Sequence, residues 1–462
     1  MKTVALIKKL TASGATAGLC FLAITNLAYA DNNNDNNNNP TDPGVRGGPA
    51  NAGNMLPGLT TDQGNAFVIA QNTFEEVDSV SGTLPGETGN GLGPSFNLNS
   101  CAACHAFPSI GGSSPFTNPQ IRIATLDGAN NTIPSFISRN GPVREARFVT
   151  NPDGTPDGGV HDLFVITGRK DAPPGFNLPQ TNFAPQVADN NVIFRIPTPT
   201  FGAGLIEMIL DKTITANQAA NASDKADLGI AGQENHSGND GTVTRFGWKA
   251  QNKSLLMFAG EAYNVEQGVT NDLFPNPRQD GGLTAPTAFP EDTVDLATGG
   301  ISDIENFMIF MRLLDAPQQR IPNGISAASV ANGEKNFDTV GCALCHTKTL
   351  QTGPSMVASL SNQEVHLFSD LLIHHMGPNL ADGVAQGGAA GDQFRSAPLW
   401  GLGQRIFFLH DGRTSNLITA IEDHASKGNS TYPDSEANKV VKNYNNLSSS
   451  QQQDLLNFLR SL

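Results

Sequence analysis

The chain has 462 residues and a formal net charge of −15, with 28 basic and 43 acidic residues. A chain this acidic repels phosphate backbones and shows no basic stripe, which excludes nucleic acid as a partner. The length allows two domains or one large one, and 48 glycines and 29 prolines predict many loops between short elements.

The first thirty residues have the pattern of a secretory signal peptide. Lys2, Lys8 and Lys9 precede an apolar stretch, and small residues at 28–30 (Ala-Tyr-Ala) suit a cleavage site. No later stretch has the roughly 18 to 20 apolar residues that a membrane span requires. We therefore expect a periplasmic or secreted protein without a membrane span.

Residues 31–57 follow the signal peptide and begin with DNNNDNNNNPTDPG. The segment stays poor in large apolar side chains, so it cannot bury enough surface to order itself. We predict a disordered Asn/Asp-rich leader.

All cysteines beyond the predicted signal peptide lie in two copies of one motif, CAACH at 101–105 and CALCH at 342–346. A zinc ribbon needs its pairs roughly 15 to 20 residues apart, and a redox dithiol needs no histidine after its second cysteine. The pattern is that of c-type haem attachment, in which two thioethers hold the porphyrin and the histidine binds the iron. We predict two covalent haem c groups, attached through Cys101, Cys104, Cys342 and Cys345, with His105 and His346 as proximal ligands.

The region around the second motif looks like a class I cytochrome c domain. Apolar residues at helical spacing precede the motif, and the chain ends in LSSSQQQDLLNFLRSL. Ser448 and Gln451 are spaced as a capping box, and an apolar stripe follows at Leu455, Leu456, Leu459 and Leu462. We expect a mainly α fold with long loops and few short strands, built from two cytochrome c-type domains: residues 58–321, with an interdomain insertion, and 322–462.

A weak internal repeat supports two haem domains. The phrase from Arg195 to Glu207, RIPTPTFGAGLIE, and the phrase starting at Arg395, RSAPLWGLG, both read arginine, proline, aromatic, Gly-x-Gly. Together with the duplicated motif, this repeat favours two homologous domains.

The chain resembles the di-haem oxidoreductase family, sometimes labelled thiol oxidoreductases, within the bacterial di-haem cytochrome c peroxidase superfamily. The phrases that carry the resemblance are GLGPSFNLNSCAACH, RFGWKAQNKSLLMFAGEAYNVEQGVT, DLLIHHMGPNLADG and LWGLGQRIFFLHDGRTSNLITAIEDH. The resemblance implies a peroxidase-like enzyme with two haem c groups and an interdomain calcium ion whose ligands the sequence does not locate. The thiol label finds no support, because haem attachment uses every cysteine of the mature chain.

The resemblance also suggests the sixth iron ligand of the C-terminal haem. His424 follows the HDGR phrase that begins at His410, at the spacing where related peroxidases carry a distal methionine. Met376, in HHMGPNLADG, is the alternative. We expect His410 beside a haem propionate rather than on the iron, and Arg195 and Arg395 in the surroundings of the haems.

The N-terminal haem is expected to keep an open iron position. The stretch after its motif, AFPSIGGSSPFTNPQIRI, contains neither histidine nor methionine. The repeat places Glu207 where the family carries a distal glutamate, which would move a proton between the peroxide oxygens; a solvated helix residue is the alternative. Trp248 is a candidate electron relay between the haems, with ordinary packing as the alternative.

These features predict a periplasmic di-haem c peroxidase-like oxidoreductase. Electrons from a small cytochrome or cupredoxin would pass from a low-spin C-terminal haem to a high-spin N-terminal haem, where hydrogen peroxide is reduced. Two alternatives stay open. One is a di-haem electron-transfer cytochrome without peroxidase activity, and the other is a haem-dependent oxygenase of an organic substrate.

Overall fold

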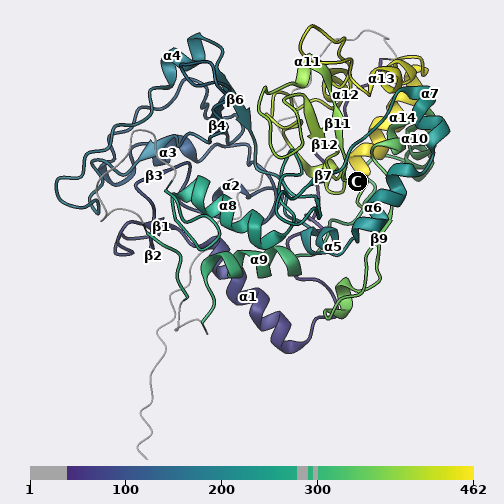
Figure 1. The fold of residues 1–462 in the computed structure, drawn as a ribbon. Coiled ribbons are helices and arrows are strands. Elements are labelled where there is room, and N and C mark those ends of the chain that lie inside the picture. Colours follow the sequence, from purple (N-terminus) through teal and green to yellow (C-terminus); the bar gives the residue numbers. More distant parts are fainter. Residues whose placement is uncertain (1–38, 278–289, 295–299) are drawn as a thin grey trace, which may run out of the picture. The chain divides into compact units, whose positions relative to one another are not determined.

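The computed structural model describes residues 39–277, 290–294 and 300–462. The predicted signal peptide, and residues 31–38 of the predicted leader, lie outside these ranges. The described residues form a mostly helical structure with a few short strands (Figure 1), as the sequence predicts. Among them, no helix combines the length and the apolar character needed to cross a membrane.

The longer helices are α1 (Thr61–Glu75), α6 (Asp211–Ala219), α8 (Leu255–Gln267), α9 (Asp303–Leu313), α10 (Ala327–Val340), α13 (Asn438–Asn445) and α14 (Ser449–Ser461). The shorter ones are α2 (Cys101–Cys104), α3 (Gln120–Ile123), α4 (Phe183–Ala188), α5 (Ala203–Glu207), α7 (Ala222–Leu228), α11 (Gly377–Leu380) and α12 (Leu417–Asp423). The second motif forms a 3₁₀ turn at Cys342–Leu344.

Within the described ranges, all named strands form two-stranded ladders, and one of these is parallel: β1 (Asp78–Ser79) with β2 (Gly89–Asn90). The antiparallel pairs are β3 (Ser95–Phe96) with β5 (Phe164–Val165), β4 (Glu145–Phe148) with β6 (Val192–Arg195), β7 (Asn235–His236) with β8 (Val243–Thr244), β9 (Leu350–Gln351) with β10 (Glu364–Val365), and β11 (Ile373–His375) with β12 (Gln393–Arg395).

The C-terminal helices follow the sequence pattern closely. Ser448 and Gln451 form the predicted capping box at the start of α14, and all four leucines of the predicted stripe are buried. Helix α14 packs along α10 (Figure 1), where the Phe337 and Phe458 rings meet edge to face with centroids 5.5 Å apart. This helix pair forms one side of the second motif's surroundings.

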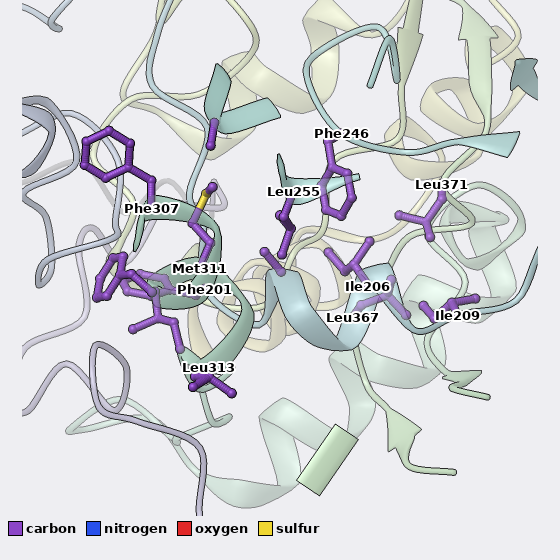
Figure 2. Packing of buried hydrophobic residues seen from close by; sticks show 14 of the residues in the cluster. Phe201, Ile206, Ile209, Phe246, Leu255, Phe307, Met311, Leu313, Leu367 and Leu371 are labelled. Atoms are coloured by element: carbon purple, nitrogen blue, oxygen red, sulfur yellow. The ribbon is translucent and has the colours of Figure 1, made fainter. Parts of the chain in front are cut away.

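The largest hydrophobic cluster is shared by the two halves of the chain (Figure 2). It includes Phe307 and Met311 from α9 and Ile206 from α5, together with Leu367 and Leu371, which follow the second motif. Residues on both sides of the expected boundary near 321 therefore share this cluster, whereas a second cluster, which includes Phe337 and Leu456, lies almost wholly on the C-terminal side.

Residues 39–57 differ from the expected disordered leader. They form almost no regular structure, but the Asp42 carboxylate accepts hydrogen bonds from Nε and Nη2 of Arg460, both at 2.8 Å. The Leu56 N–H donates to the Leu313 carbonyl at 2.8 Å. The Arg460 side chain is almost fully buried and needs a carboxylate partner, which this segment supplies. Specific polar contacts hold it in place despite its poor apolar content.

Candidate functional site

Each Cys-x-x-Cys-His motif lines its own cavity. The first cavity contains Cys101, Cys104 and His105, and its walls come from α8, α9, β4 and β6. The second contains Cys342, Cys345 and His346, and its walls include residues of α12, α13 and α14. Two cysteines and a histidine facing one mainly apolar cavity are the set that a covalently attached haem requires.

Three of the motif cysteines are poorly suited to thiol–disulfide chemistry. All four described cysteines are unpaired. Burial raises the pKa of Cys101 and Cys104 well above the ordinary value and that of Cys342 to about 12. Since the thiolate is the reactive form, these thiols fit a haem attachment site better than a redox dithiol.

Three histidines share an arrangement that suits iron ligands. In each, Nδ1 lies against a backbone carbonyl, which can only accept, so Nδ1 carries the proton and Nε2 keeps its lone pair. The carbonyl partners are Gly112 for His105 (3.0 Å), Phe368 for His346 (3.1 Å) and Ala420 for His424 (2.6 Å). Burial lowers the pKa of His105 and His346 to about 4 and also lowers that of His424, which favours the neutral ring that a metal needs.

The second cavity contains both candidates for its sixth ligand. His424, the residue after α12, and Met376 both line it. A positive charge on His424 would lower the pKa of His346, which places the two rings near each other. Met376 packs in an apolar cluster with Leu380 and Phe394. The contact of His424 Nδ1 with the Ala420 carbonyl leaves its Nε2 free to bind a metal and favours His424, and the assignment stays a prediction.

His410 lies on the wall of the second cavity, buried and stacked on Phe394 with centroids 4.2 Å apart. Burial lowers the pKa of its imidazole to about 4. Its position is compatible with the expected place beside the haem rather than on the iron.

Glu207 is not where the repeat placed it, because it does not line the first cavity. One carboxylate oxygen accepts a hydrogen bond from the Leu255 N–H at the start of α8 (2.9 Å), and the other pairs with Arg312 Nε of α9 (2.7 Å). Both oxygens therefore serve helix packing. The expected role as distal acid has no support from this position.

Other carboxylates line the first cavity and were missed by sequence reasoning. Glu145 pairs with Arg147 at 2.6 Å, and Glu261 accepts a hydrogen bond from Asn252 at 2.5 Å. Within the described part of the chain, the Glu266 side chain has no hydrogen-bond or ion-pair partner. The available signal was the phrase GEAYNVEQ, which places two acids on a helix that is otherwise largely buried.

Burial raises the pKa of Glu266 to about 8, and repulsion from Glu145 and Glu261 acts in the same direction. Its carboxyl group is therefore mostly protonated at neutral pH. Besides His105, the only histidine or methionine among the described residues lining this cavity is Met311 of α9.

Trp248 lies between the cavities and lines both. Its Nε1–H donates to the Ile196 carbonyl at 2.9 Å, and its ring meets His410 edge-on with centroids 6.4 Å apart. Arg195 lines the first cavity and Arg395 the second, and their place beside the haems stays a prediction.

A family model described as "Di-haem oxidoreductase, putative peroxidase" matches residues 144–462, which is more than half of the chain. The chain belongs to the di-haem oxidoreductase family. This membership confirms the resemblance and shows that the protein is an oxidoreductase. The first motif lies before the matched residues, so its role rests on the motif and its cavity.

Three solved structures share limited similarity with this di-haem oxidoreductase, each with a TM-score of 0.28. Hydrazine synthase from Kuenenia stuttgartiensis is 15% identical, with 64% of this chain and 97% of that chain covered. A MauG-like protein associated with microbial copper homeostasis is 16% identical (64% and 95% covered), and the diheme peroxidase BthA from Burkholderia thailandensis E264 is 14% identical (58% and 86%). A comparison with curated proteins finds no match.

The described residues contain no group of three or more His, Cys, Asp or Glu side chains arranged to hold a metal ion. The structure therefore adds no ligands to the expectation of an interdomain calcium ion.

Proposed function

We propose that this di-haem oxidoreductase reduces hydrogen peroxide at the first cavity, with electrons supplied through the second. Reduction of one hydrogen peroxide to two waters consumes two electrons and two protons. Haem c bound at each motif would supply the redox-active iron. The chain's own residues then have three tasks: to hold the cofactors, to deliver protons and to separate the two sites.

Glu266 is the proton donor in this proposal, and the main support for the proposal is that its carboxyl group is mostly protonated at neutral pH. The side chain faces the cavity of the first motif, has no partner among the described residues and has a pKa raised by burial to about 8. A protonated carboxyl group can donate to a departing oxygen at neutral pH. Neighbouring Glu261 and Glu145 are already engaged by hydrogen-bond donors.

Electron entry is proposed at the second cavity, where His346 and His424 would complete a low-spin coordination. Trp248 would relay electrons from there, since its ring lines both cavities. The donor in this proposal is a small cytochrome or cupredoxin in the periplasm or outside the cell, consistent with the signal-peptide pattern in the sequence.

The test is Glu266→Gln, which keeps the shape of the side chain but removes the titrating proton. We expect peroxide turnover with an artificial donor to fall by about a hundredfold to ten-thousandfold. Optical and paramagnetic-resonance spectra of the ferric protein should stay nearly unchanged, because no iron ligand is altered. Since Glu266 acts as an acid, turnover of the unmutated protein should fall as pH rises through about 8, and the variant should lack this decline.

The matched control is Glu207→Gln, the same chemical change at the other candidate carboxylate. It should retain turnover, because Glu207 lies outside the first cavity. Loss of turnover in this control, with full activity in Glu266→Gln, would reverse the assignment. Absence of turnover in the unmutated protein, under oxidising and reducing preincubation alike, would contradict the peroxidase proposal itself.

One observation favours a second candidate function, that of a pure electron carrier. Met311 lines the first cavity together with His105, and binding of its thioether to the haem iron would exclude peroxide from that iron. Under this alternative, the resting spectrum of the unmutated protein should contain only low-spin signals. Met311→Ala should then convert the signal of the first haem to high spin.

A further inference from the structure

The second cavity has two arginines on its wall, Arg395 and Arg405, and neither has a carboxylate to itself. Within the described part of the chain, the Arg405 side chain forms no hydrogen bond or ion pair. Arg395 donates only to backbone carbonyls, from Nε to Gly247 at 3.0 Å and from Nη1 to Ser396 at 3.4 Å. The cavity thus presents two guanidinium groups with unused donors.

Among the residues that the structure describes, the two arginines lack a compensating negative charge. Burial lowers the pKa of Arg395 and of Arg405 to about 10, and the charge of Arg405 also lowers that of Arg395. Asp370 is the carboxylate that raises the pKa of Arg395. Its oxygens, however, already contact His374 Nε2 (3.0 Å) and the Ser396 hydroxyl (2.6 Å). Two largely desolvated cations without a free carboxylate partner are unfavourable, so a negatively charged ligand should bind beside them.

We propose that Arg395 and Arg405 bind the two carboxylates of the haem attached at Cys342 and Cys345. The inference rests on the proposed function in one respect, that this cavity holds a haem. A planar guanidinium fork matches a carboxylate with two parallel hydrogen bonds, which makes arginine the suitable residue.

This assignment also orients the cofactor. Both arginines line a smaller adjoining cavity, which is shared with Trp248 and with Thr198 and Thr200 from the wall of the first cavity. The backbone N–H of Arg395 donates to the Trp248 carbonyl at 2.9 Å. A haem held by these two arginines would have its carboxylates on the side of the cavity toward Trp248, where the backbone of Arg395 contacts the proposed relay.

The test is the reduction potential of the second haem in the full holoprotein with Arg405→Gln. Removing one buried positive charge beside two carboxylates should disfavour addition of an electron. We expect the equilibrium constant for its one-electron reduction to fall by about tenfold or more, which equals about 59 mV. The matched control is Arg122→Gln, which removes the same charge from an exposed arginine that lines none of these three cavities and should leave the potential unchanged.

The haem content, measured by mass spectrometry of denatured protein, distinguishes a failure of the proposed function from a failure of the present inference. If the unmutated protein lacks a haem at the second motif, the proposed function fails. If both haems are present and Arg405→Gln has the potential of the Arg122→Gln control, only the present inference is overturned.

Arg405→Lys keeps the charge and provides the test if the glutamine variant does not mature. Lysine lacks the planar fork, so the carboxylate stretching bands of the haem in a redox-induced infrared difference spectrum should shift from those of the unmutated protein. Identical bands would overturn the assignment of Arg405.

Discussion

At the scale of single residues, the contacts of an imidazole ring indicate whether it suits a metal ligand better than its place in the sequence does. His105, His346 and His424 each carry their Nδ1 proton against a backbone carbonyl and line a motif cavity. The motifs predicted the first two directly from spacing. His424 could be proposed only by resemblance, since the sequence shows neither the carbonyl of Ala420 near its ring nor the cavity it faces.

Replacing His424 by glycine should open the iron of the second haem. If His424 is the sixth ligand, we expect a low-spin ferric signal in the unmutated protein that becomes high-spin in the variant without loss of haem, because the cysteines and His346 are untouched. Paramagnetic resonance of the oxidised protein measures this change. Met376→Leu is the control, since it keeps the apolar packing with Leu380 and Phe394 but removes the thioether. A low-spin signal that survives in the first variant and disappears in the second would make Met376 the ligand.

At the scale of helices and strands, short sequence patterns predicted the features that depend on neighbouring residues. The capping box and the leucine stripe of α14 follow from neighbours three and four residues apart, and both are present. The role of Glu207 depends instead on partners 48 and 105 residues away, at Leu255 and Arg312. An alignment of short repeated phrases contains no information about such partners, so it could not predict that both oxygens of Glu207 are engaged by α8 and α9.

Glu207→Ala should therefore destabilise the fold. The change leaves the Leu255 N–H at the start of α8 and the Arg312 guanidinium without their acceptor, and the Glu207 side chain is only 9% exposed. Loss of these contacts should lower the free energy of unfolding by about 1–3 kcal/mol. Denaturant unfolding of the holoprotein, followed by far-ultraviolet circular dichroism, measures the effect. Unchanged stability would mean that these contacts are weak in solution.

At the scale of the whole chain, buried ion pairs join segments that lie far apart in the sequence. Asp382 accepts a hydrogen bond from Arg195 Nη2 of β6 at 2.7 Å and lies 3.0 Å from the Lys249 ammonium. The Asp382 and Lys249 side chains are fully buried, and that of Arg195 is 4% exposed. Composition and spacing predicted two haem sites, but they could not predict this ion cluster or the common core in Figure 2. Both depend on long-range packing.

Asp382→Asn tests whether this cluster holds the segments around the cavities together. Burial alone would raise the pKa of Asp382, but Arg195 and Lys249 keep it below the ordinary value, so the carboxylate is charged at neutral pH. Neutralising it removes the carboxylate that pairs with both buried cations, and breaking a buried ion pair in this way typically costs about 3–5 kcal/mol. We expect a loss of that order in the free energy of unfolding of the holoprotein. Asp411→Asn, which disrupts the more exposed pair with Arg413, should cost at most about 1 kcal/mol. Equal effects of the two substitutions would show that the buried cluster has no special part in stabilising the molecule.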